Sequence, residues 1–329
     1  MTVTKVIVVY PEGRTPPPVE RLPEDVKVLL VQTELELREA MPGVHIMFLN
    51  DFRTDLLRRV GPGDLRWIHT SSLGVDALLT PAIVESDIMI TNSRGVCERP
   101  IAEWVLATIL LFAKDIHRTI RLQLQHTWQH RETESITDRR ALVLGPGGVG
   151  RETTLLLRRA GMTVDVVGRS ARVDAELGQV HPVTDLDALL ANANDVVVAL
   201  PLTDGTRHII DERRMSLMRP GVRLINVGRG ALVDQAALVS ALDSGQIGAA
   251  ALDVFEQEPL PSTHPFWSMA NVLVSPHMSG DLVGWRDRVV DSFAANLRRW
   301  RSGGSLRDVV DLSAHGASRP ALLGQLVQE

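Results

Sequence analysis

The chain has 329 residues, of which 44% are hydrophobic and 23% charged, so it can form packed cores and does not belong to the wholly disordered class. At roughly 150 residues per domain, this length predicts about two domains. The formal net charge is -5 and the lysines and arginines form no long run, which excludes nucleic acid and anionic membranes as expected partners.

The N-terminal third alternates short apolar runs with helical or loop segments such as residues 34–41 and 54–60. This alternation is typical of βαβ units, which build a parallel sheet covered on both faces. Residues 12–23 contain four prolines and are predicted to form a surface connection. The predicted strands of this first series are residues 5–10, 45–50, 66–70 and 87–91.

Two further features bear on where the protein works. The most apolar segment, residues 104–113, is too short to span a membrane. The single cysteine, Cys97, excludes an intramolecular disulfide and a multi-thiolate metal site. We therefore expect a cytoplasmic protein with no membrane partner and no metal.

The middle of the chain predicts a bridging helix and then a second sheet. Residues 101–116 have apolar side chains at helical spacing after Pro100. Residues 282–300 predict another long helix, which could return the chain to the first domain. Between the two helices lie six predicted strands, a number that suits a nucleotide-binding sheet: residues 141–145, 163–167, 195–200, 222–227, 249–254 and 271–275.

A glycine-rich turn follows the first strand of this second series. Its pattern is GxGxxG, formed by Gly145, Gly147, Gly148, Val149 and Gly150. In such a turn the first glycine allows a tight bend, the second lets backbone approach a pyrophosphate, and the last lets helix and strand pack closely. Similar turns also serve as plain βα connections. The strand before it and the helix after it favour dinucleotide binding here.

The end of the next strand predicts which dinucleotide binds. An acidic residue at this point would bind the ribose 2′-hydroxyl of NAD, but the position is Gly168. Arg169 and Ser170 follow, with Arg172 nearby, and these side chains suit the 2′-phosphate of NADP. The chain has only three lysines, so arginine is its usual surface cation and Arg169 could be merely that. We predict NADP(H) as the preferred cofactor, with NAD(H) possible.

Polar residues follow three later strands, where an open α/β sheet places its ligands. Arg229 between two glycines could bind a carboxylate through both arms of its guanidinium, and His277 could donate a proton. Taken singly, they could equally be a surface ion pair and a structural histidine. Reduction of a 2-oxoacid needs both groups. A carboxylate bonded to the imidazole would fix its tautomer, and Glu258 is the candidate.

Four segments together resemble the D-isomer-specific 2-hydroxyacid dehydrogenase family, with glyoxylate/hydroxypyruvate reductase-like enzymes as the nearest kin. The resemblance covers almost the whole chain. Its segments are residues 145–150, 224–231 (LINVGRGA), 251–259 (ALDVFEQEP) and 275–280 (SPHMSG).

This resemblance implies roles for individual residues. Arg229, Glu258 and His277 match the family's catalytic set, and Asp253 is expected to contact the nicotinamide carboxamide, with Val227 also in the cofactor site. The backbone amides of Leu73 and Gly74 resemble the loop that holds the substrate carboxylate. Formate dehydrogenases of the superfamily have glutamine where Glu258 stands, so formate is disfavoured as the substrate.

The resemblance also implies the organisation of the molecule. We expect an α/β protein of two Rossmann-like or flavodoxin-like doubly wound parallel-sheet domains with an interdomain cleft. Residues 1–98 plus 284–329 would bind substrate and residues 99–283 the dinucleotide, and two chains would form a homodimer. Residues 312–329 match no pattern that we can interpret.

The expected activity is NAD(P)H-dependent reduction of a small 2-oxoacid to the D-2-hydroxyacid, with His277 as proton donor. The alternative is a non-catalytic protein that senses dinucleotides, similar to corepressors of the same fold. The sequence contains no motif that resembles a docking site for a corepressor partner.

Overall fold

The computed structural model describes residues 3–50 and 55–312. The chain divides into two compact units, the first formed by residues 1–97 and 282–329 and the second by residues 98–281. Of the segment 312–329, only Leu312 lies within the described residues, and it packs against a core of the first unit. Within the described ranges, no helix is long and apolar enough to cross a membrane.

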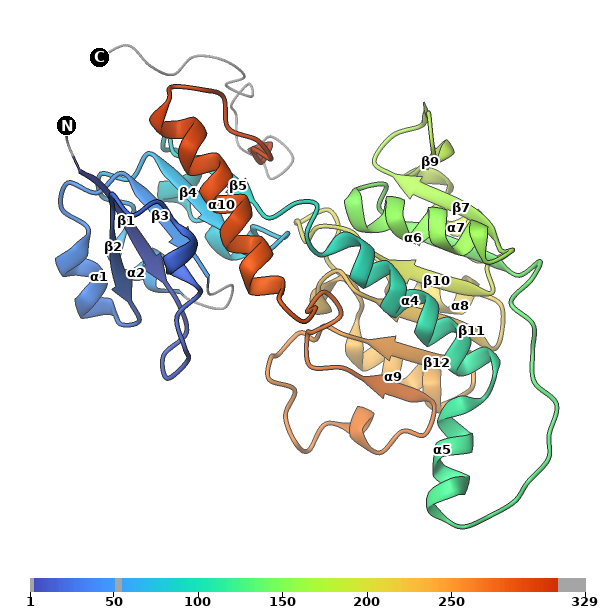
Figure 1. Ribbon diagram of the computed structural model, residues 1–329. Coiled ribbons are helices and arrows are strands. Elements are labelled where there is room, and N and C mark those ends of the chain that lie inside the picture. Colours follow the sequence, from blue (N-terminus) through green and yellow to red (C-terminus); the bar gives the residue numbers. More distant parts are fainter. Residues whose placement is uncertain (1–2, 51–54, 313–329) are drawn as a thin grey trace. The chain divides into compact units, whose positions relative to one another are not determined.

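The first unit contains a parallel sheet whose described strands have the order β2-β1-β3-β4-β5 (Figure 1). The four predicted strands are present. Strand β2, which pairs with β1 at the edge of the sheet, was not predicted although five of its six residues are apolar, because a short apolar run does not by itself distinguish a strand from a helix. The strands are β1 (Thr4–Val9), β2 (Val26–Val31), β3 (Ile46–Leu49), β4 (Trp67–Thr70) and β5 (Met89–Asn92).

Side chains alternate between the two faces of this sheet and build two cores. Ile7 and Val9 of β1 pack with α1 and α2, whereas Val6 and Val8 pack with Phe293 of α10. The C-terminal helix therefore completes the core of the N-terminal unit. The helices are α1 (Glu34–Ala40), α2 (Leu56–Val60), α3 (Pro81–Val84) and α10 (Trp285–Arg301), with short 3-10 turns η1 (Val19–Arg21) and η2 (Asp76–Leu78).

The second unit, which is described throughout, has a sheet of order β13-β12-β11-β10-β6-β7-β9-β8. All six predicted strands are present, and they are parallel. The sequence analysis missed the hairpin β8–β9 at the edge. The strands are β6 (Arg140–Leu144), β7 (Thr163–Gly168), β8 (Arg172–Asp174), β9 (Gly178–Pro182), β10 (Asp195–Val198), β11 (Val222–Asn226), β12 (Ile247–Leu252) and β13 (Val272–Val274).

Helices cover both faces of the second sheet (Figure 1). The predicted bridging helix, residues 101–116, is α4, which ends at Ala113. Asp115 has φ 49° and separates α4 from a further helix, α5, which was not predicted. The helices are α4 (Glu98–Ala113), α5 (Ile116–Leu124), α6 (Gly148–Arg159), α7 (Leu186–Leu190), α8 (Glu212–Leu217) and α9 (Gln235–Asp243), with 3-10 turns η3 (Val183–Asp185), η4 (Gly230–Leu232) and η5 (Pro265–Trp267). The predicted α/β class with two doubly wound sheets is confirmed.

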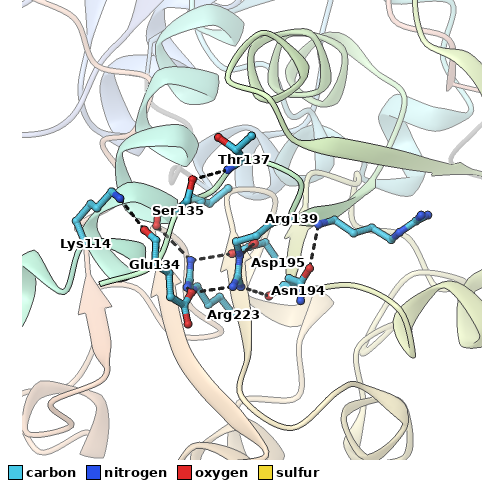
Figure 2. Close-up of polar contacts among 10 residues, drawn as sticks. Lys114, Glu134, Ser135, Thr137, Arg139, Asn194, Asp195 and Arg223 are labelled. Carbon is cyan, nitrogen blue, oxygen red and sulfur yellow. Dashed lines mark hydrogen bonds and ion pairs between the residues drawn. The ribbon is translucent and has the colours of Figure 1, made fainter. Parts of the chain in front are cut away.

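A cluster of charges lies at the amino ends of β6, β10 and β11 (Figure 2). Asp195 is fully buried there, and it accepts hydrogen bonds from Arg139 Nε at 3.2 Å and Arg223 Nη1 at 3.5 Å. Both arginines also pair with Glu134, in the segment that leads into β6. Burial raises the pKa of Asp195, against the opposing effect of the two arginines. The cluster fastens residues 125–139 to the sheet.

Candidate active site

Strands β11, β12 and β13 are neighbours in the sheet and end at the same edge, so the loops that follow them start close together. In the register of the sheet, Asn226 of β11 lies beside Leu252 of β12, which lies beside Val274 of β13. The pattern continues one residue on, because Asp253 N donates to Asn226 O at 3.1 Å and Ser275 N donates to Leu252 O at 2.9 Å. The loops that carry Arg229, Glu258 and His277 therefore start side by side at the carboxyl edge.

His277 and Glu258 form a pair. His277 Nδ1 lies 2.9 Å from Glu258 Oε2, and the other carboxylate oxygen accepts from the backbone N–H of Phe255 at 3.1 Å. An ionised carboxylate only accepts hydrogen bonds, so Nδ1 carries the proton and donates it. The side chains are 24% and 17% exposed, respectively. The structure thus places together the two residues that the sequence paired as proton donor and partner.

Asp253 holds the loop that carries His277. Its carboxylate accepts hydrogen bonds from Ser275 Oγ at 2.6 Å, Met278 N at 2.9 Å and Ser279 N at 3.0 Å. His277 lies inside this loop with φ 56°, a left-handed conformation that costs energy in a residue other than glycine. The sequence did not indicate this anchoring role, because Asp253 and the groups that donate to it are 22 to 26 positions apart and no local pattern links them.

Arg229 is positioned by the two glycines beside it. A Cβ atom at Gly230 would lie 1.9 Å from the backbone carbon of Phe255, and one at Gly228 would lie 2.9 Å from Leu200 O. Only glycine allows this approach of the Arg229 loop to its neighbours. The side chain of Asn226, which the sequence analysis also missed, donates to Arg229 O at 2.9 Å and accepts from Gly228 N at 3.1 Å.

The glycine-rich turn after β6 fits a pyrophosphate. Gly145 has φ +111°, and a Cβ atom there would lie 2.4 Å from Ala199 O. A Cβ atom at Gly150 would lie 1.7 Å from Gly145 O, whereas at Gly147 it would meet no atom within 4 Å. Helix α6 begins at Gly148 without a side-chain cap, so its first amides suit an anion, and Val149 lies in this first turn. These residues could hold a dinucleotide.

The tip of β7 presents the residues predicted to choose between NADP and NAD. Arg169 and Ser170 are exposed after Gly168, and the hairpin β8–β9 follows them. A Cβ atom at Gly168 would lie 3.3 Å from Arg172 Nη1, so this guanidinium sits at the tip of the strand. Val227, predicted to line the cofactor site, is buried at the end of β11 and donates its N–H to Val198 O at 3.1 Å.

Leu73 and Gly74 lie in the loop after β4 in the first unit. Asn92 Nδ2 donates to Leu73 O at 2.9 Å, and Ser93 Oγ donates to Thr70 O at 3.1 Å. Neither of these anchoring residues was predicted. Asn92 is the last residue of β5 and Ser93 follows it. Strand β5 lies beside β4 in the sheet.

A buried histidine supports the same loop. Burial lowers the pKa of His69 to about 3, so the ring is neutral near pH 7. Its Nδ1 lies 2.7 Å from Thr91 Oγ1, which accepts from Trp67 Nε1 at 2.8 Å, and its Nε2 lies 3.3 Å from Ser93 Oγ. Ser93 donates onward to a carbonyl, and this chain of donors is consistent with a proton on Nε2. Residues 3–50 and 55–312 contain no cluster of three or more His, Cys, Asp or Glu side chains able to hold a metal ion.

Known proteins resemble the chain in both sequence and structure. Residues 106–279 match the family model described as D-isomer specific 2-hydroxyacid dehydrogenase, NAD binding domain. The chain is 32% identical to a glyoxylate reductase of Aeropyrum pernix, over 73% of this chain and 74% of the relative. It is 34% identical to glyoxylate/hydroxypyruvate reductase B of Pectobacterium atrosepticum, over 65% and 69% of the respective chains.

Two solved structures extend the likeness to 94% of this chain and 99% of each of theirs. One is an NADPH-dependent glyoxylate/hydroxypyruvate reductase from Sinorhizobium meliloti in complex with NADP and sulfate, with a TM-score of 0.82 and 26% identity. The other is a D-isomer specific 2-hydroxyacid dehydrogenase from Xanthobacter autotrophicus in complex with NADPH and MES, with a TM-score of 0.79 and 29% identity.

Proposed function

Because the chain belongs to the D-isomer-specific 2-hydroxyacid dehydrogenase family, as its motifs predicted, we propose that it reduces a small 2-oxoacid to the D-2-hydroxyacid. Glyoxylate and hydroxypyruvate are the first substrates to consider, since relatives that are 32% and 34% identical carry those names. The observation that carries the proposal is the pair of His277 and Glu258 at the carboxyl edge of the sheet.

Each proposed catalytic residue is assigned one step. Glu258 accepts a hydrogen bond from Nδ1 of His277, which leaves Nε2 as the atom that donates a proton to the forming alkoxide. Arg229 is the proposed ligand of the substrate carboxylate. The family resemblance assigns the backbone amides of Leu73 and Gly74 to substrate binding. The nicotinamide cofactor, when bound, supplies the hydride. Asp253 fixes the histidine loop and remains the proposed contact for the carboxamide.

NADPH is the proposed reductant. Arg169 and Ser170 follow a strand that ends in glycine rather than an acid, and the structural relatives named above bind NADP or NADPH. The glycines 145, 147, 148 and 150, with Val149 and Val227, would hold the rest of the dinucleotide. The family resemblance further supports a homodimer in the cytoplasm, and light scattering after gel filtration tests the dimer.

The test is a set of initial rates of NADPH and NADH oxidation. The substrates are glyoxylate, hydroxypyruvate, pyruvate and phenylpyruvate at matched concentrations. Faster turnover with NADPH than with NADH on any of these substrates supports the proposal. The size of the preferred acid indicates the size of the substrate pocket. Tight binding of NADPH without turnover of any 2-oxoacid would contradict it and favour a dinucleotide-sensing protein.

A further inference from the structure

The hairpin β8–β9 is tied to helix α6 by an ion pair that the proposed reaction does not use. Arg151 is the first residue after the glycine-rich turn, and Asp174 ends β8. Arg151 Nη1 donates to Asp174 Oδ1 at 3.0 Å and Nη2 donates to Oδ2 at 2.6 Å. This two-pronged geometry fixes both side chains more firmly than a single contact would.

Asp174 also shapes the turn between the two strands. Its Oδ1 accepts from Glu176 N and Leu177 N, each at 3.0 Å. Its side chain is only 14% exposed, and the bonds from Arg151 and these amides hold its pKa well below the ordinary value. The carboxylate is therefore ionised near neutral pH and joins the hairpin turn to the helix.

The same hairpin carries Arg172 at the tip of β7. Arg172 pairs with Val180 in the hairpin, and Val180 pairs with Val166 of β7. This register sets the Arg172 guanidinium beside Gly168, with Nη1 3.3 Å from where a Cβ atom would stand. Across residues 3–50 and 55–312, neither Arg169 nor Arg172 forms an ion pair, whereas Arg151 is paired with two carboxylates.

We propose that Asp174 is a positioning residue for recognition of the adenosine 2′-phosphate: by holding Arg151 and the hairpin turn, it keeps Arg172 at the tip of β7. The inference rests on the proposed use of NADPH. Asp174 itself touches no phosphate, and its negative charge would repel one. Removing it should nevertheless weaken phosphate binding, because the hairpin that presents Arg172 loses its tie to α6.

The sign of the effect separates this role from simple electrostatics. If Asp174 acted only through its charge, Asp174→Ala would strengthen binding of a phosphate at the tip. The positioning role predicts the reverse. Calorimetric titration with adenosine 2′,5′-diphosphate and with adenosine 5′-monophosphate, which differ only in the 2′-phosphate, measures the preference for that group directly and without turnover.

We expect Asp174→Ala to lower that preference roughly tenfold, the size of one lost charge-assisted hydrogen bond, with binding of adenosine 5′-monophosphate unchanged. In an Arg172→Ala background, Asp174→Ala should have no further effect, because the pair acts through Arg172. Asp187→Ala is the matched control, since Asp187 is likewise an aspartate paired with arginine, here Arg213 and Arg214, and its loss should leave the preference alone.

Retention of adenosine 5′-monophosphate binding shows that a variant is folded. Asp174→Asn, which keeps the size of the side chain, should lose part of the preference. An unchanged or increased preference in Asp174→Ala would overturn the inference and leave the proposed function standing. If the wild-type protein does not prefer the 2′-phosphate, the NADPH assignment fails and the inference with it.

Discussion

The amino and carboxyl edges of the second unit's sheet both carry charged side chains, but the burial and pairing of these side chains differ. At the amino edge, Asp195 is fully buried between Arg139 and Arg223, and Glu134 pairs with both arginines (Figure 2). At the carboxyl edge, His277 and Glu258 form one pair and keep 24% and 17% exposure. At the amino edge, the charged side chains pair with one another and join separate segments of the chain. The carboxyl edge keeps a titratable ring partly accessible at the ends of three strands.

A buried charge therefore does not by itself identify a catalytic residue. Burial raises the pKa of Asp195, so its arginines do not fully offset the loss of hydration. Removing one partner from such a cluster should therefore harm the fold. Removing a member of the carboxyl-edge pair should harm the reaction and spare the fold. Substitutions at the two edges test this contrast between an effect on stability and an effect on catalysis.

The largest expected effect is on the reaction. His277→Asn should lower kcat for 2-oxoacid reduction by about 10²–10⁴-fold, because the proton donor is lost. Cofactor affinity and the free energy of unfolding should stay close to those of the wild-type protein. Steady-state rates and fluorescence titration with NADPH provide the measurements, and unchanged turnover would remove His277 from the catalytic role.

The amino edge should show the opposite pattern. Arg223→Met leaves Asp195 with one arginine and should lower the free energy of unfolding by about 3 kcal/mol, while kcat of the folded protein changes little. Urea denaturation, monitored by circular dichroism, measures the free energy of unfolding. The control is Arg213→Met, which removes an exposed arginine paired with Asp187 and should lower the free energy of unfolding far less. Equal losses in both variants would contradict the importance of the cluster.

Glu258→Gln should affect activity through the positioning of His277. The carboxylate holds Nδ1 of the ring by a charge-assisted hydrogen bond, so replacing it with a neutral amide should lower kcat by roughly tenfold. Steady-state rates of both proteins with NADPH make the comparison. An unchanged kcat would mean that Glu258 does not position the proposed proton donor.

The smallest effect concerns the cofactor. Arg169→Ala should raise the KM for NADPH by about tenfold and leave the KM for NADH alone, because only NADPH offers a phosphate to the guanidinium. The ratio of the two values is the readout. An unchanged ratio would identify Arg169 as an ordinary surface arginine.

The sequence predicted most of what depends on local pattern. Strands with strong apolar runs and the glycine-rich turn were found, because backbone geometry restricts which residues such positions accept. Two edge elements were missed for different reasons. Strand β2 is a short apolar run, which does not by itself distinguish a strand from a helix. The hairpin β8–β9 is short and polar and shows no buried apolar pattern.

Local sequence patterns were enough to predict the alternation of strands and helices, the glycine-rich turn, and the types of side chain that follow β11, β12 and β13. Which of these side chains contact one another depends on the three-dimensional fold. The contacts of Asp253 with the histidine loop, of Asp195 with two arginines, and of Asp174 with Arg151 join residues that are 22 to 56 positions apart. Such contacts depend on strand order and register, which no local pattern encodes.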